Sequence, residues 1–339
     1  MHHRMDFDYH GEMIKDINDQ NKTIRKRALE NCLSLASNDE SFLKTEGKED
    51  LIRAILKCFN DKYERCREFS TEIAVLFVKK HKEDMKQHLP YIFQIFFRRL
   101  SVEEEYEPSE EVRMRLMTLL STIFETYPSD LNMYVEDTIE VIINTLEDKC
   151  PDIKKQAAEN LIRIAGTNKK VFYARGENLV APLARNISHR QASVRSVTVA
   201  AVGQLVLATQ GGVFEDLVNH MAQRVFDPNP GVRLKHVEVI GSWLVAMPDR
   251  YSYWYKLVPL LLVSLADNVP EIVAAAEVAW AEAGLQWLEE NKMNDKRLKD
   301  EMDFLTEDPA HYPDWIERPN LGCRLHLVFQ INYNIDNNI

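Results

Sequence analysis

FDPNPGVRLKHVEVIGSWL, residues 226–244, contains a turn that is followed at once by an apolar pattern of helical spacing. Asp227, two prolines and Gly231 come first, and the apolar pattern continues beyond Arg233. Proline is favoured in the first turn of a helix, because the N–H that it lacks would have no partner there. The stretch therefore predicts a turn and then a helix that begins near Pro230.

Similar stretches recur along the chain at a nearly constant spacing. The pairs equivalent to Val232–Arg233 are Ile24–Arg25, Cys66–Arg67, Val112–Arg113, Ile153–Lys154 and Val194–Arg195, with Ile272–Val273 as a degenerate seventh. Successive pairs lie 42, 46, 41, 41, 38 and 40 residues apart. A period near forty with two helices per period is typical of HEAT repeats. We therefore predict an all-α fold, an α-solenoid (superhelix) of about seven HEAT-type two-helix repeats over residues 1–290.

Two further positions in each repeat are always apolar. They lie eight and eleven residues after the first residue of the pair, as Leu161 and Ile164 do after Ile153. Steps of eight and eleven return a helix to the same face, so these residues are expected to form one buried stripe.

An acid stands six residues before most of the bases. Asp227 precedes Arg233 in this way, whereas His189 precedes Arg195 and Val273 replaces the base of the seventh repeat. We expect the acid of the turn and the base of the following helix to meet along the stack, and the acid to cap the helix N-terminus. Residues expected in this charged ladder are Asp19, Arg25, Asp61, Arg67, Glu107, Arg113, Asp148, Lys154, Arg195, Asp227 and Arg233.

The recurrence of the ladder indicates a structural role, because a catalytic residue is needed only once. A partly exposed ion pair contributes about 0.2–1 kcal/mol, whereas one buried Leu, Ile or Phe contributes about 1.5–3 kcal/mol. We therefore expect the apolar stripe to stabilise the fold and the ladder mainly to set the register of the repeats.

Composition and motifs exclude several classes of function. The formal net charge of −11 argues against binding nucleic acid, which requires a basic face. The chain has no HExxH, GxxxxGK[ST], GxGxxG or GxSxG motif, and none of its ten histidines is followed by Glu. We expect no catalytic residue, no metal and no cofactor.

Cysteine usage and hydropathy predict the compartment. The five cysteines are odd in number, scattered and without a CxxC motif, as is usual for reduced thiols in the cytosol. The longest strongly apolar run, LVPLLLVSLA at 257–266, is too short to span a bilayer. We predict a soluble cytoplasmic protein.

The segment DRYSYWYKL, residues 249–257, has four aromatic residues within five positions: Tyr251, Tyr253, Trp254 and Tyr255. A helix cannot turn all four toward one side. They either pack the joint between the sixth and seventh repeats or contact a protein partner, where aromatic residues are favoured.

The pattern changes after residue 290. Residues 291–318 are rich in acids and contain Pro309 and Pro313, so we expect an acidic, partly flexible connector. Residues 319–339 are expected to be the truncated start of a further helical region.

Four stretches carry a family resemblance: QRVFDPNPGVR, DRYSYWYKLVPLLLVSLADNVPEI, GLQWLEEN and HYPDWIERPNLGCR. Together they resemble the family of HEAT-repeat dynein axonemal assembly factors numbered five, closely over residues 220–325. This resemblance implies a non-catalytic cytoplasmic factor for the pre-assembly of axonemal dynein arms. Implied partners are dynein intermediate and heavy chains, other assembly factors and chaperones. The alternative is a generic HEAT-repeat adaptor, similar to a phosphatase scaffold or a transport receptor.

Overall fold

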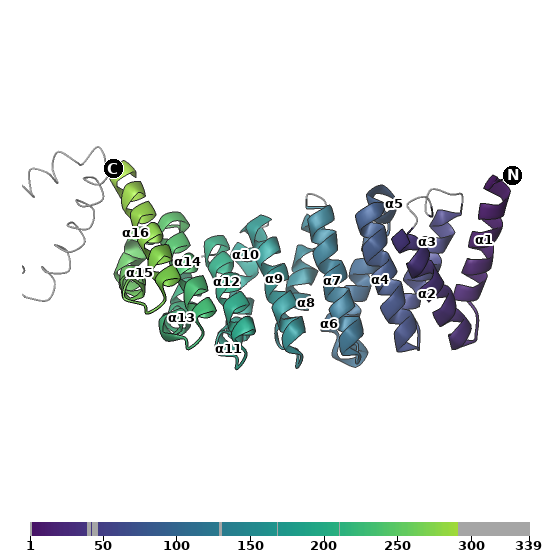
Figure 1. Cartoon of the computed structure of the whole chain (residues 1–339), viewed down its shortest axis with the longest axis horizontal. Coiled ribbons are helices and arrows are strands. Elements are labelled where there is room, and N and C mark those ends of the chain that lie inside the picture. The colour runs from purple at the N-terminus through teal and green to yellow at the C-terminus, as the bar shows by residue number, and fades with distance from the viewer. Residues whose placement is uncertain are drawn as a thin grey trace, which may run out of the picture. The chain divides into compact units, whose positions relative to one another are not determined.

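The computed structural model describes residues 2–38, 42, 47–128, 131–167, 169–209 and 211–290. These residues form helices joined by turns (Figure 1). The expected connector at 291–318 and the expected helical region at 319–339 lie outside the described residues. The chain divides into two compact units, one up to His236 and one from Val237 onward.

The N-terminal unit alternates between two kinds of helix. The first helices of the repeats are α1 (His2–Ile17), α3 (Lys48–Lys57), α6 (Leu89–Ser101), α8 (Val135–Leu146), α11 (Val180–Asn186) and α13 (Gly211–Ala222). The second helices are α2 (Lys22–Asn38), α4 (Glu64–Lys80), α7 (Glu110–Thr126), α9 (Pro151–Thr167) and α12 (Ala192–Ala208). The short helices α5 (Lys82–Lys86) and α10 (Lys169–Arg175) lie between repeats.

The helices of this unit stack in two layers. In the layer of second helices, α2 packs against α4, α4 against α7, α7 against α9, and α9 against α12. In the other layer, α6 packs against α8, α8 against α11, and α11 against α13. Figure 1 shows these helices side by side from α1 to α13. The arrangement confirms the predicted all-α solenoid.

The apolar stripe lies in the core. Leu161 and Ile164 of α9 are fully buried, and so are their equivalents Leu120 and Ile123 in α7. Leu35 is half-buried rather than buried. Each fully buried side chain of this size contributes about 1.5–3 kcal/mol, so the stripe is the main source of stability.

The second unit contains the end of α14 (Pro230–Ala246), with α15 (Arg250–Ser264) and α16 (Pro270–Glu290). Helix α15 packs against α16. A Cβ atom at Gly241 would lie 2.7 Å from the Cβ of Ala279, so only glycine allows α14 and α16 to approach this closely. Ile240 and Trp243 of the stripe are buried, whereas Trp280 is half-buried.

Cysteines in the described residues are buried free thiols, namely Cys32, Cys58, Cys66 and Cys150. Burial raises the pKa of Cys32 and of Cys58 to about 12, so both thiols stay protonated near neutral pH. Within the described ranges, none of the helices has both the length and the hydropathy of a membrane span.

Candidate interaction surfaces

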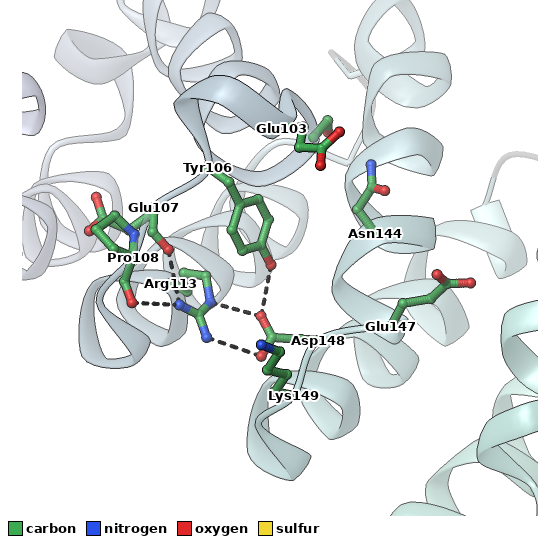
Figure 2. Close-up of a pocket in the computed structure, with 10 residues that line it drawn as sticks. Glu103, Tyr106, Glu107, Pro108, Arg113, Asn144, Glu147, Asp148 and Lys149 are labelled. Carbon is green, nitrogen blue, oxygen red and sulfur yellow. Dashed lines mark hydrogen bonds and ion pairs between the residues drawn. The ribbon is translucent and has the colours of Figure 1, made fainter.

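Arg113, in the first turn of α7, connects two consecutive repeats. Its Nε and Nη2 donate to Oδ2 and Oδ1 of Asp148 at 2.7 and 3.1 Å, and Asp148 lies in the turn of the next repeat. Its Nη1 donates to the carbonyl oxygens of Glu107 and Pro108, in its own turn, at 2.9 and 3.0 Å (Figure 2). We call such an arginine, together with the carboxylate of the next repeat, a rung.

The same geometry recurs in the N-terminal unit. In each rung both nitrogens of the guanidinium edge donate to the two oxygens of one carboxylate, at 2.6–2.8 Å in the rungs other than Arg113–Asp148. Those rungs are Arg25–Asp61, Arg67–Glu107 and Arg195–Asp227. The six-residue spacing has a simple cause, because each arginine also donates to the backbone carbonyl six residues before it.

Arg233 makes the same backbone contact as the arginines of the rungs. Its Nη1 donates to the carbonyl oxygen of Asp227, six residues before it, at 2.8 Å. The Asp227 carboxylate accepts instead from Arg195 of the preceding repeat. The acid and the base that stand six residues apart therefore meet through the backbone of the acid and not through its side chain.

The carboxylates also organise the turns. Asp148 Oδ1 accepts from the N–H of Cys150 at 2.8 Å, and Cys150 directly precedes the first residue of α9. This differs from the expected cap, because the N–H that is bound belongs to the turn and not to the first helical turn. The acids with the same contact, two residues along, are Asp19, Asp61, Glu107, Asp227 and Asp267.

Three side chains outside the repeat pattern complete the rungs. Arg99 of α6 adds a second guanidinium to Glu107 at 2.8 Å, and Arg224 does the same for Asp227 at 3.1 Å. The hydroxyl of Tyr106 donates to Asp148 Oδ2 at 2.7 Å. Sequence reasoning missed these residues because none of them recurs at the forty-residue period.

The rung contacts lower the pKa of Asp148 and of Asp227. Burial disfavours the charge of Asp148, but hydrogen bonds from Arg113, from the Cys150 N–H and from Tyr106 outweigh burial and lower its pKa. The pKa of Asp227 is lowered in the same way, with Arg195 as the principal donor. Burial and the hydrogen bond to Asp148 raise the pKa of Tyr106, so its proton stays on the donor.

Lys154 interrupts the series. Its Nζ donates to the carbonyl oxygen of Leu146 at 2.7 Å and to Oδ1 of Asn186 at 3.0 Å. His189 occupies the position of the acid, and its Nδ1 accepts from the Gln191 N–H at 3.1 Å, as a carboxylate does elsewhere. Burial lowers the pKa of both Lys154 and His189, and the positive charge of Lys154 lowers that of His189 further.

A groove of about 690 Å³ lies beside the Arg113–Asp148 rung. Figure 2 shows its lining, which includes Glu103, Tyr106, Asn144 and Glu147. Carboxylates and an amide on such a rim can bind cationic side chains. In the described part of the chain, no three His, Cys, Asp or Glu residues lie together as metal ligands would.

The four aromatic residues of α15 diverge. Tyr251 donates its hydroxyl to Glu290, and its ring lies 5.0 Å from that of Trp254. Tyr253 and Trp254 are half-buried, whereas Tyr255 is 70% exposed. The segment therefore contributes both to packing and to the surface of its unit.

The chain is similar in sequence to one family of known proteins. A family model described as "Dynein axonemal assembly factor 5-like, TPR repeats" matches residues 16–301. Dynein axonemal assembly factor 5 of Xenopus laevis is 35% identical over 316 residues, which are 93% of this chain and 37% of that protein. The human protein of the same name is 33% identical over 284 residues, which are 83% of this chain and 33% of that protein. The chain thus spans little more than a third of the length of these relatives.

Solved structures support the repeat type. A designed armadillo repeat protein has a TM-score of 0.53 at 15% identity, over 67% of this chain and 97% of its own. Importin beta has a TM-score of 0.53 at 16% identity, over 81% of this chain and 35% of its own. The family description names TPR repeats, whose period is about 34 residues, but the longer spacing here and both neighbours correspond to HEAT and armadillo repeats.

Proposed function

This chain belongs to the dynein axonemal assembly factor 5-like family, and on that premise we propose that it is a non-catalytic cytoplasmic scaffold for the pre-assembly of axonemal dynein arms. The observation that carries the proposal is the 35% identity to the Xenopus laevis assembly factor over 93% of the chain. The proposed partners are dynein intermediate and heavy chains, other assembly factors and chaperones.

The architecture of the N-terminal unit suits a scaffold. Stacked helix pairs present a long continuous surface, which large clients need for extended contact. The rungs connect consecutive repeats through buried, charge-assisted hydrogen bonds, except at the Lys154 position. A surface connected in this way is pre-organised, so binding a client requires little ordering of the scaffold.

The charge of the chain favours one kind of client segment. A net charge of −11 attracts basic segments over long range and repels nucleic acid. The exposed carboxylate of Glu103, beside the groove, supplies such charge at the edge of the solenoid, whereas Glu147 is paired with Arg185. We therefore expect basic segments of dynein subunits to be among the contacts.

The proposal is tested in a flagellated cell from which the gene has been deleted. Electron microscopy of axonemes should show that outer arms, and some inner arms, are missing, and motility should fall. Re-expression of the gene should restore both. Normal arms and normal motility in the deletion strain would refute the proposal.

Affinity capture from cytoplasm separates this function from that of a generic adaptor. Dynein chains and chaperones should be recovered with the tagged chain. Recovery of phosphatase subunits or of a small GTPase, without dynein chains, would instead identify a phosphatase-scaffold or transport-receptor-like adaptor.

A further inference from the structure

The second helices α2 and α9 each expose a strip of residues at the same three positions. The strip lies five, nine and twelve residues after the ladder base, and these steps return a helix to the same face. In α9 the strip is Glu159, Arg163 and Gly166, all exposed. In α2 it is Glu30, Ser34 and Ser37, also exposed. These strips are polar or small, as expected for surfaces in contact with water.

The same positions in α16 are different. They are Val278, Glu282 and Leu285, and Leu288 follows three residues later. Val278 is 59% exposed, although the helices before it have Glu, Thr or Ala at this position. Leu285 is 67% exposed, whereas the apolar residues at its position in other helices, Leu207 and Val245, are half-buried. Apolar side chains grouped on one exposed face are typical of an interaction surface. Their spacing of three, four and seven residues is that of helix-on-helix recognition.

The charge on α16 narrows the choice of partner. Over its 21 residues α16 has five glutamates and no Lys, Arg or His. Glu277, Glu282 and Glu289 are exposed among the apolar residues of the strip. By contrast, α2 begins with four bases, Lys22, Arg25, Lys26 and Arg27. The face of α16 is therefore both apolar and uniformly acidic.

We propose that Val278, Glu282, Leu285 and Leu288 of α16 form a docking surface for an amphipathic partner segment whose apolar side chains are flanked by Lys or Arg. The apolar residues bury the partner's apolar face, and the glutamates attract and orient its bases. The inference deepens the proposed function. It rests on that function only for the protein that supplies the segment, which would be a dynein subunit or another assembly factor.

Charge complementarity favours a partner over the chain itself. Residues 291–318 contain eight acids against five Lys or Arg, so the stretch that follows α16 has the same sign of charge as the strip. A second copy of the chain would bring an identical acidic face against the first, and like charges would repel. A basic segment of another protein has neither disadvantage.

The test uses the full chain and a fluorescent 18-residue helical peptide made of leucine and lysine. Fluorescence anisotropy should show saturable binding, and the same peptide with glutamate in place of lysine should bind at least tenfold more weakly. The double variant Leu285→Ser with Leu288→Ser changes only exposed side chains and should weaken binding at least tenfold. The variant Glu282→Lys should also weaken it.

A matched control lies on α9. Arg163→Ser changes the equivalent strip of another second helix and should leave peptide affinity unchanged. Equal affinity of the chain and the Leu285→Ser, Leu288→Ser variant would overturn the proposal, as would absence of binding to the full chain. A dimer that the double variant dissociates would overturn it too, since the occupant would then be a second copy. If the double variant still captures dynein chains from cytoplasm, this inference fails while the proposed function stands.

Discussion

The Arg113–Asp148 rung and the Lys154 position lie one repeat apart and are built differently. Arg113 makes two hydrogen bonds to a carboxylate, which Tyr106 also contacts. Lys154 instead contacts an amide oxygen and a carbonyl oxygen, and the turn of the next repeat has His189 in place of an acid. A buried guanidinium without a carboxylate would destabilise the fold. Because His189 replaces the acid of the fifth repeat, the base of the fourth repeat is Lys154, whose smaller ammonium group can bind neutral oxygens instead.

This difference shows that each rung depends on residues from two consecutive repeats. Side chains of Arg113 and Asp148 are only 10% and 1% exposed, so the pair does not belong to the class of exposed ion pairs. Removing one member of a buried pair leaves the other charged and unpaired, which costs far more than the net contribution of an exposed pair.

Breaking a complete rung should have the largest effect. Asp148→Ala removes the acceptor of Arg113, Tyr106 and the Cys150 N–H, and should lower the free energy of unfolding by about 3–5 kcal/mol. Urea denaturation followed by circular dichroism measures the change. His189→Ala, at the same position one repeat later, is the control and should cost less than about 1 kcal/mol because no ion pair is lost. Equal losses in the two variants would contradict the comparison.

As the pH falls, the Lys154–His189 region should lose stability at a higher pH than the Arg113–Asp148 rung. The pKa of His189 is lowered, so its contribution to stability is complete above the unfolded value near 6.5 and is lost as pH falls below it. The pKa of Asp148 is lowered, so its contribution is complete above the ordinary value near 3.8 and is lost only as pH falls through the lower, folded value. The Lys154 region should therefore weaken first.

His236 must be replaced before that difference can be measured. It is fully buried, and among the described residues neither ring nitrogen has a hydrogen-bond partner. Burial lowers its pKa to about 4, so the wild type should lose up to about 3 kcal/mol between pH 6.5 and pH 4. Unfolding of His236→Leu, measured at a series of pH values, should show a much smaller loss over this interval. Identical pH dependence in the two proteins would show that His236 is not buried as a neutral ring.

Rebuilding the interrupted rung should stabilise the fold by a smaller amount. Lys154→Arg combined with His189→Asp restores both members, and should raise the free energy of unfolding by about 1 kcal/mol. Lys154→Arg alone should destabilise, because the guanidinium would lack a carboxylate. A double-mutant cycle should therefore give a favourable coupling of about 0.5–3 kcal/mol. Strict additivity would mean that residues 154 and 189 do not meet.

The smallest effect is expected for an exposed pair between the same two helices. Arg163 of α9 and Glu125 of α7 are 2.8 Å apart, with side chains 39% and 51% exposed. Arg163→Ala should change the free energy of unfolding by at most about 1 kcal/mol. The same urea titration measures it, and a loss as large as that of Asp148→Ala would show that burial does not distinguish rungs from surface pairs.

Much of the fold could be predicted because it repeats. The apolar stripe and the forty-residue spacing are visible in the sequence, and prolines mark the starts of α9, α14 and α16. Helix pairing then follows, since each amphipathic helix must bury one face.

The partner of each base could not be predicted in the same way. Asp19 and Asp61 stand at fixed distances from Arg25 along the chain, and spacing alone does not reveal which carboxylate receives the guanidinium. The choice depends on how far successive repeats are displaced, which is a property of tertiary packing. Tyr106, Arg99 and Arg224 were missed because single contacts leave no periodic signal.

The central claim is that an arginine of one repeat binds the carboxylate of the next, and a double-mutant cycle on Arg113 and Asp148 tests it most directly. The single variants to Ala and their combination should yield a coupling energy of about 2 kcal/mol or more. Additive losses, or a stronger coupling of Arg113 to the Glu107 side chain of its own turn, would contradict the account.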